Sequence, residues 1–232
     1  PLRLNGMFAF AVYDRARRRI FMARDRFGEK PLYYAHTPQT LAFASELSAL
    51  VRHSGLNRDI STRGLRKLLG YGFIPSPNTI YDGCEKLPPG HWLSFDIAEG
   101  SLQRQAYWRF RLEPDDALGA RGVDTLADEL LALLQTATSR RLMSDVPLGI
   151  FLSGGIDSSA VLAMAARAGS SRPLHAFSIG FEEASFDELP HARTVAEHLQ
   201  VRQSAEVLSL ERARNLLSKV LSGVDEPFAD AS

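Results

Sequence analysis

One stretch, residues 146–160, most constrains how this chain can fold, because it predicts a short buried strand, a turn at two glycines and a helix. The apolar run 148–152 lies between Pro147 and the pair Gly154-Gly155, as in a strand covered on both faces. Glycines permit positive φ and close approach of a ligand to the backbone, and the first amides of a helix lack intrahelical partners. The junction therefore predicts an anion-binding site.

The residues around the glycines indicate which anion is bound. A Walker loop is excluded, since no Gly-Lys pair occurs in the chain. Instead the hydroxyls of Ser153, Ser158 and Ser159, with the amides of residues 154–159, are predicted to hold phosphate oxygens. Asp157 would be repelled by phosphate unless a divalent cation joined them, so we interpret it as a Mg²⁺ ligand.

The pattern Ser-Gly-Gly-x-Asp-Ser-Ser resembles that of the PP-loop, or N-type, ATP pyrophosphatases, which adenylate a substrate and release pyrophosphate. Two other interpretations were weighed. The segment could be an ordinary strand-to-helix turn of an α/β protein that happens to contain serines. A nucleophile elbow would need glycine at position 151, where the chain has Phe151.

Composition excludes several classes of protein. The 232 residues are 45% hydrophobic and 23% charged, which suits a globular protein, and 27 basic residues balance 27 acidic ones. Neutral charge favours neither a nucleic-acid nor a membrane partner. Cys84 is the only cysteine, so disulfide frameworks and cysteine zinc clusters are excluded. No apolar run approaches the roughly 20 residues that span a bilayer, and we expect a cytoplasmic protein.

The first half of the chain predicts antiparallel strands. Short alternating runs at 7–13, 20–23, 32–35 and 41–44 indicate a β meander, and further strands are expected at 92–97 and 106–112. Ser45 and Ser61 are expected to cap short helices reaching about residues 53 and 69. The polar stretch 113–122 is the predicted linker.

The second half alternates helix and strand. Leucines at helical spacing predict an amphipathic helix over 123–143 that covers a sheet. Strands at 148–152, 174–181 and 201–207, with helices at 158–168, 187–199 and 209–221, indicate a parallel sheet. Ligands bind at the carboxyl ends of such strands, which predicts adenine against Phe151 or Leu152 and the backbone of Ile179. Phe177 is expected in the core, and for Ile179 a core role stays open.

Several motifs together resemble the glutamine-hydrolysing asparagine synthetase family, of the asparagine synthetase B type. They are residues 153–159, Phe177-Ser-Ile-Gly-Phe181 and Asp225-Glu-Pro-Phe-Ala-Asp230 in the second half, with 5–14, 23–34, 43–46 and 87–90 in the first. The resemblance implies an α+β part with antiparallel sheets, belonging to an N-terminal-nucleophile glutaminase, followed by an α/β parallel-sheet, PP-loop part of the HUP-like type. The expected domains are 1–112 and 123–232, joined by the linker 113–122.

The resemblance implies a ligase. Glutamine gives ammonia, ATP activates aspartate or a related carboxylate as an acyl-adenylate, and ammonia forms the amide. The implied cofactors are ATP and Mg²⁺, with Asp157 as the metal ligand. The resemblance is also compatible with a homodimer. The nucleotide-site residues are Phe151, Leu152, Ser153, Gly154, Gly155, Ile156, Asp157, Ser158, Ser159 and Ile179.

The chain also departs from the family pattern. The glutaminase nucleophile of the family is an N-terminal cysteine, whereas this chain begins with Pro1, so we expect a fragment without that catalytic residue. Cys84 is no substitute, and Arg24 with Asp25 suits a structural ion pair or a tunnel wall. Asp225, Glu226 and Asp230 are left unassigned. Alternatives that stay open are an amidotransferase for another acceptor, a tRNA-modifying or guanylate-forming ligase, and a nucleotide-binding module without turnover.

Overall fold

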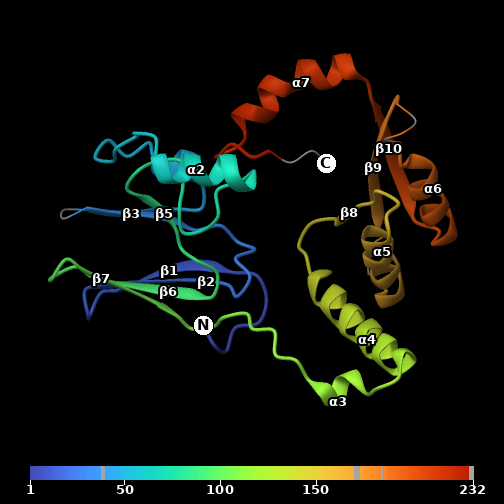
Figure 1. Ribbon diagram of the computed structural model, residues 1–232, viewed down its shortest axis with the longest axis horizontal. Coiled ribbons are helices and arrows are strands. Elements are labelled where there is room, and N and C mark those ends of the chain that lie inside the picture. Colours follow the sequence, from blue (N-terminus) through green and yellow to red (C-terminus); the bar gives the residue numbers. More distant parts are fainter. Residues whose placement is uncertain (38–39, 170–172, 184, 186, 230–232) are drawn as a thin grey trace. The chain divides into compact units, whose positions relative to one another are not determined.

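The computed structural model describes residues 1–37, 40–169, 173–183, 185 and 187–229, and it divides the chain into two compact units. The first unit comprises residues 1–113 together with 221–232, and the second comprises residues 114–220 (Figure 1). The chain thus passes from the first unit to the second and returns. Each unit is described by itself.

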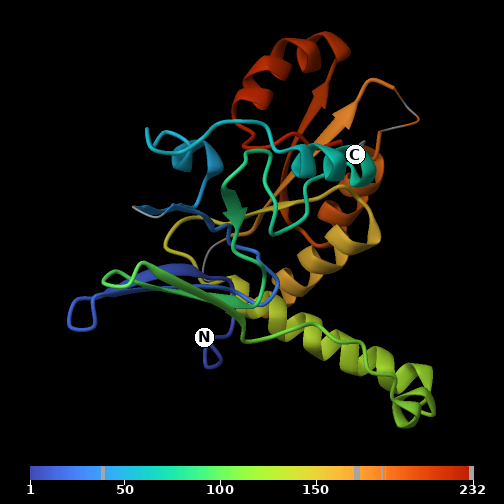
Figure 2. The same ribbon diagram turned by 60° about the vertical axis from the view of Figure 1, so that its left-hand side comes forward.

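Two antiparallel sheets form the first unit (Figure 1). One has the order β1-β2-β6-β7, with β1 Ala9–Asp14, β2 Arg19–Arg24, β6 His91–Asp96 and β7 Ser101–Ala106. The other has the order β4-β3-β5, with β3 Tyr33–Thr37, β4 Thr40–Ala44 and β5 Cys84–Lys86. The two sheets lie face to face (Figure 2). Buried side chains of both form one cluster, which consists of Met22, Leu32, Tyr34, Leu87 and Leu93.

The prediction of one continuous meander is wrong. The first four strands form two hairpins, β1 with β2 and β3 with β4, which belong to different sheets. The reason lies between Arg24 and Leu32, where the Asp25 carboxylate accepts hydrogen bonds from the amides of Phe27, Glu29 and Lys30 at 3.0–3.1 Å. These bonds fold the connection into a compact turn, so β3 leaves the first sheet instead of pairing with β2.

The strand expected at 106–112 is also wrong, since the last strand of this unit is the polar segment Ser101–Ala106. Asp96 sets the turn before it by accepting hydrogen bonds from the amides of Ala98 and Glu99 at 3.0 and 3.2 Å. This turn pairs Asp96 with Ser101 and His91 with Ala106. Residues 107–112 therefore lie beyond the end of the hairpin.

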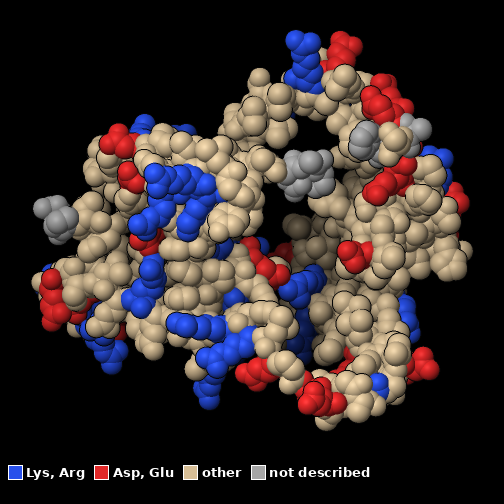
Figure 3. Space-filling view, in the orientation of Figure 1, with Lys and Arg blue, Asp and Glu red and all other residues tan. Residues whose placement is uncertain are grey.

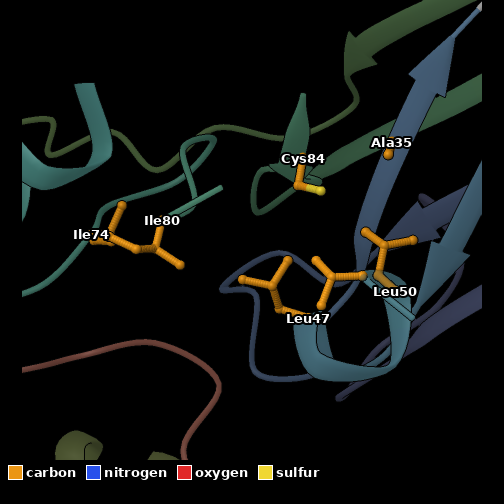
Figure 4. Close-up of a cluster of buried hydrophobic side chains, with 7 residues drawn as sticks. Ala35, Leu47, Leu50, Ile74, Ile80 and Cys84 are labelled. Carbon is orange, nitrogen blue, oxygen red and sulfur yellow. The ribbon is translucent and has the colours of Figure 1, made fainter. Parts of the chain in front are cut away.

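Two helices pack on the second sheet. Ser61 caps α2 (Thr62–Tyr71) as predicted, because its hydroxyl accepts from the Gly64 amide at 3.2 Å. The predicted cap at Ser45 is wrong: α1 (Leu47–Leu50) begins after Glu46, which makes no side-chain cap bond. A buried cluster joins the helices to the sheet, and Figure 4 labels Ala35, Leu47, Leu50, Ile74, Ile80 and Cys84 in it.

The second unit confirms the predicted parallel sheet. Its strands are β8 (Gly149–Phe151), β9 (His175–Phe181) and β10 (Arg202–Leu208), in the order β10-β9-β8. Its helices are α3 (Asp116–Gly119), α4 (Val123–Arg141), α5 (Ile156–Ala168), α6 (Leu189–His198) and α7 (Leu210–Ser222). The short α3 lies inside the segment expected to be an irregular linker.

Helices α5 and α6 cover one face of this sheet. Their residues Leu162, Ala192 and Ala196 form a buried cluster with Leu152 and Ala176 of the sheet segment. Helix α4, expected to cover the sheet, instead contacts α5 (Figure 2). In α4, Leu130 and Leu133 stay more than half exposed. Within the described residues, no helix is both long and apolar enough to cross a membrane.

Charged side chains are mixed on the face shown in Figure 3, where Lys and Arg lie among Asp and Glu. The most evident basic group on this face lies over α2, whose sequence carries Arg63, Arg66 and Lys67. The basic residues of this helix thus gather within three turns, so the neutral overall charge does not mean an evenly neutral surface.

Candidate functional site

The loop 153–159 connects β8 to α5 and is closed by its own serines. The hydroxyl oxygens of Ser153 and Ser158 lie 3.1 Å apart, and the amides of Ser153 and Gly155 each donate to one of them at 3.3 Å. Ser158 Oγ also donates to the carbonyl of Gly155 at 3.2 Å. The two side chains therefore hold the loop in its curve and occupy its inner side.

Gly154 is required by the packing of this loop. Its φ is +91°, and a Cβ atom there would lie 2.6 Å from the amide nitrogen of Ala192 and 2.7 Å from Cβ of His191. Only glycine tolerates both the dihedral angle and the approach to α6. Gly155 differs, since its φ is −68° and the nearest atom to an added Cβ is Ser153 Oγ at 3.4 Å.

The first turn of α5 presents amides without intrahelical partners. The Ser159 amide makes the first bond of the helix, to the Gly155 carbonyl at 3.1 Å, which leaves the amides of Ile156, Asp157 and Ser158 before it. Gly155 and Ser159 already use their amides, so only part of the predicted set 154–159 can bind an anion. The partial positive charge of a helix N-terminus suits phosphate oxygens.

Asp157 is exposed in this first turn. Among residues of the described ranges, none pairs with its carboxylate, and no group of three or more His, Cys, Asp or Glu side chains could hold a metal ion by itself. Mg²⁺ commonly takes one or two protein carboxylates and completes its shell with substrate phosphate and water. A single free carboxylate beside an anion site fits that donor set.

The structure separates Ser159 from the other two serines. Its Oγ is buried and has no partner among the described residues, and the residue lines a groove of about 390 Å³ with Thr194 and His198. This groove runs between α5 and α6. The structure thus places the Ser159 hydroxyl in this groove, apart from those of Ser153 and Ser158, and its contact with phosphate stays a prediction.

A second cavity, of about 770 Å³, lies where β8 ends and β9 and β10 continue. It is lined by Phe151, Phe177, Ser178, Ile179, Ser204, Ala205 and Glu206. Phe151 and Ile179 are 84% and 59% exposed. Phe151, one of the two alternative side-chain contacts predicted for adenine, therefore lines this cavity, as does Ile179, whose backbone was the other predicted contact. Phe177, expected in the core, is 40% exposed and lines the same wall, because its strand buries alternate residues Ala176, Ser178 and Gly180 instead.

Leu152 contributes to the site through its backbone, because its side chain is buried in the core beneath α5 and α6. Its amide donates to the Phe177 carbonyl at 2.8 Å. Its carbonyl accepts from the buried hydroxyl of Ser178 at 2.6 Å, and Ser178 in turn accepts from Gln203 Nε2 at 2.8 Å. Sequence reasoning missed Ser178 and Gln203, although a polar residue inside the run 177–181 was a usable signal.

The Arg24 and Asp25 side chains do not form the expected ion pair. Arg24 donates to the carbonyls of Gly28, Lys30 and Leu87 at 2.7–2.8 Å. Asp25 is 1% exposed, and burial raises its pKa, but hydrogen bonds from backbone amides leave that pKa below the usual value. Both side chains therefore form hydrogen bonds with backbone groups around one turn, Arg24 with carbonyls and Asp25 with amides, which is a structural role.

Cys84 is buried in the second sheet of the first unit, and burial raises the pKa of its thiol. A nucleophilic cysteine needs the opposite shift, because the thiolate is the reactive form. The expectation that Cys84 does not replace a glutaminase nucleophile agrees with this environment.

Two protein-family models match the chain, one after the other. Residues 2–108 match a glutamine amidotransferase domain, and residues 129–232 match asparagine synthase. The boundary between the two matches falls in the same region as the division between the compact units after Glu113.

Curated relatives agree with both matches. A putative asparagine synthetase [glutamine-hydrolyzing] 2 of Methanocaldococcus jannaschii is 34% identical over 98% of this chain and 44% of its own length. Asparagine synthetase [glutamine-hydrolyzing] 3 of Bacillus subtilis is 39% identical over 78% of this chain and 29% of its own. A putative asparagine synthetase [glutamine-hydrolyzing] of Mycobacterium tuberculosis is 36% identical over 98% of this chain and 35% of its own length.

The chain therefore spans less than half the length of these relatives. Two of the three match 98% of this chain and the third matches 78%. The two family models match in the order that the sequence motifs predict. The chain belongs to the glutamine-hydrolysing asparagine synthetase family.

Proposed function

We propose that the protein containing this chain is an ATP-dependent ligase that makes asparagine with ammonia from glutamine. In this proposal residues 1–112 belong to an N-terminal-nucleophile glutaminase domain, and residues 123–232 belong to a PP-loop synthetase domain of the HUP-like type. The segment 113–122 joins them. The observation that carries the proposal is the loop 153–159, whose free amides and exposed carboxylate adjoin an open cavity on a parallel sheet.

The chemistry begins with a carboxylate that has no good leaving group. An oxygen of the aspartate side chain attacks the α-phosphorus of ATP, the bond to the β-phosphate oxygen breaks, and pyrophosphate departs. Ammonia then attacks the acyl carbon, AMP leaves, and the nitrogen loses a proton. The amides of Ile156, Asp157 and Ser158 would stabilise the negative charge that grows on the departing pyrophosphate.

Asp157 would hold Mg²⁺ against the phosphate oxygens, and Ser153 and Ser158 would keep the loop closed around them. A bound Mg²⁺ supplies electrostatic stabilisation of the phosphate charge. Adenine would lie in the cavity between Phe151 and Ile179, with the backbone of Leu152 at its edge. Ser178 fixes that backbone through its bond to the Leu152 carbonyl. We also propose a cytoplasmic location, in which free ATP, glutamine and aspartate are available.

The test is exchange of labelled pyrophosphate into ATP by the natural full-length protein. Wild type should show exchange that depends on aspartate, and Asp157→Asn should reduce it by about 100-fold or more, the typical scale for losing an electrostatic stabiliser. Asp128→Asn, on the exposed side of α4, makes the same chemical change in the same unit and should leave exchange intact. Full exchange in Asp157→Asn would contradict the role given to Asp157.

The same assay separates the alternatives. Exchange that depends on a different carboxylic acid would identify an amidotransferase for another acceptor. Tight Mg-ATP binding with no exchange for any acceptor would identify a nucleotide-binding module without turnover. Retention of tRNA, with exchange that requires it, would identify a tRNA-modifying ligase.

A further inference from the structure

The first unit contains a groove to which no function has yet been given. It has a volume of about 420 Å³, and its lining includes the rings of Phe27, Trp108 and Phe110 and the guanidinium groups of Arg26 and Arg109. Cavities of about 300–1,000 Å³ that are lined by aromatic side chains with a few polar groups are typical of small-molecule sites. The groove therefore has the size and the composition of a binding site.

Three aromatic rings form the apolar part of the groove. The ring centroid of Phe27 lies 5.0 Å from that of Trp108 and 6.2 Å from that of Phe110, and the centroids of Trp108 and Phe110 lie 6.3 Å apart. Phe27 and Phe110 are 65% and 62% exposed. Apolar side chains that are exposed as a group mark an interaction site, whereas single ones are ordinary surface. A flat ring that enters the groove can stack on one of these rings and meet the edges of the others.

Backbone hydrogen bonds hold the walls of the groove in place. The Gly90 carbonyl accepts from the amides of Tyr107 and Trp108 at 2.8 and 3.1 Å, and the Gly90 amide donates to the Asp25 carbonyl at 2.8 Å. The Phe27 amide donates to the buried carboxylate of Asp25 at 3.1 Å. Glycine is needed at position 90, because its φ is +64° and a Cβ there would lie 2.5 Å from the Trp108 carbonyl oxygen. The groove is thus preformed, which lowers the entropic cost of binding.

The charges at the groove favour an anion. Among the described residues, both charged side chains other than histidine in its lining are arginines, and none is Asp or Glu. Arg109 is exposed and has no hydrogen-bond or ion-pair partner in the described part of the chain. Arg26 donates to the carbonyls of Leu4 and Leu2 at 2.6 and 3.2 Å, and these neutral groups fix its guanidinium without cancelling its charge. Aromatic rings alone would also attract an organic cation, but two guanidinium groups repel one.

We propose that this groove binds a small molecule in which a flat aromatic ring carries a negatively charged group. The ring lies against the three aromatic side chains, and the anionic group pairs with Arg109. Nucleoside monophosphates and aromatic carboxylates share this chemistry. None of the lining residues belongs to the loop 153–159 or to the cavity beside it, so this site does not depend on the function proposed above.

Trp108 can report binding, because a ring stacked beside it changes its fluorescence. The natural full-length protein is titrated with AMP and with benzoate, one probe for each source of the ligand. We expect saturable quenching by at least one of them, and we expect it to disappear in Trp108→Phe, which keeps an aromatic wall. Trp92→Phe should retain the quenching, since Trp92 lies outside the groove and stacks on Phe21 with ring centroids 5.9 Å apart.

Two further substitutions separate the contact with the anion from the contact with the ring. Arg109→Gln removes the paired charge and should raise the Kd of the quenching probe about tenfold, the scale of one hydrogen bond to a charged group. It should leave the Kd of the uncharged analogue, adenosine or benzamide, unchanged. Phe110→Leu keeps an apolar side chain without a ring and should weaken both ligands. Arg111→Gln is the matched control, because it makes the same change at an exposed position outside the groove.

Each outcome decides. Quenching by AMP alone assigns the groove to nucleoside phosphates, and quenching by benzoate alone assigns it to aromatic carboxylates. The absence of quenching by both probes overturns the site, and so does quenching that persists in Trp108→Phe or an equal Kd in wild type and Arg109→Gln. Quenching by a single-stranded oligonucleotide but by neither probe would assign the groove to nucleic acid and overturn the small-molecule site.

Discussion

At the scale of single residues, Asp25 shows how one buried carboxylate organises a turn. Its Oδ1 accepts from the amides of Phe27 and Glu29, and its Oδ2 accepts from those of Phe8 and Lys30. Asn at this position would place an NH₂ group, which cannot accept a hydrogen bond, against one of these two pairs of backbone amides. We expect Asp25→Asn to lower the free energy of unfolding of the first unit by about 2–4 kcal/mol, measured by urea denaturation.

The effect should also depend on pH. The pKa of Asp25 is lower in the folded protein than in the unfolded chain, so the unfolded state binds the proton first as pH falls. The stability that Asp25 contributes is complete above its unfolded pKa of about 4 and is lost below it. The difference between wild type and Asp25→Asn should therefore narrow below about pH 4. Asp82→Asn, an exposed control in the same unit, should show no such difference.

At the scale of elements, the two glycines of the loop 153–159 have different roles. Gly154→Ala would force a Cβ against the backbone of α6 at a φ that disfavours alanine, and should destabilise the second unit by about 2–4 kcal/mol. Gly155→Ala meets only Ser153 Oγ at 3.4 Å and should change stability by less than about 1 kcal/mol. Thermal unfolding of the two variants provides the comparison.

Their binding behaviour should differ as well. Gly154→Ala should weaken Mg-ATP binding even at temperatures where it is folded, because the loop can no longer seat against α6. If Gly154→Ala proved as stable as Gly155→Ala, the close packing of loop and helix would be refuted. Titration calorimetry with Mg-ATP, on the natural full-length protein carrying either Gly154→Ala or Gly155→Ala, measures the two affinities.

The sequence could predict the elements of the second unit because their signals are local. Spacing placed β9 and α7 within a residue or two of their ends, and the alternation of helix and strand was sufficient to predict parallel pairing. The strand Ser101–Ala106 was missed because it is polar and mostly exposed. It is a strand because it pairs with His91–Asp96, and its own sequence has no alternation of apolar and polar residues that would predict one. Phe177 was misplaced because no local pattern tells which face of a sheet stays open.

At the scale of the whole molecule, the sequence could not reveal the return of the chain. Asp225 caps α1 from 178 residues beyond the amide it binds, and no periodicity or motif spacing records such a distance. Pro1 to Glu113 and the segment from Leu221 onward form one compact unit, although the second unit separates them in sequence. The motif 225–230 could be associated with a family, but its contacts came only from the structure, and Asp230 lies outside the described residues.

This return predicts what happens when the first connection is cut. Residues 114–120 are all exposed, so a specific protease site can replace them without removing a buried side chain. Cleavage there leaves one piece with Leu47, Ile80 and Lys86 and another with Asp225 and Glu226. Asp225 accepts hydrogen bonds from the amides of Leu47 and Ser48, and Glu226 accepts one from the Ile80 amide and pairs with Lys86. These contacts should hold the pieces together, so the pieces should elute as one species in gel filtration.

Replacing Asp225 and Glu226 should separate the two pieces. Asp225→Asn with Glu226→Gln removes the charge at α1 and leaves Lys86 without its buried partner, a loss of about 3–5 kcal/mol for a broken buried pair. The cleaved double variant should therefore elute as two smaller species, while the uncleaved one elutes as a single chain. Cleaved Glu211→Gln, which removes an exposed charge from the first turn of α7, should behave as cleaved wild type. Separation of the wild-type pieces would show that Asp225 and Glu226 bind too weakly to hold the segment after α7 to the rest of the first unit.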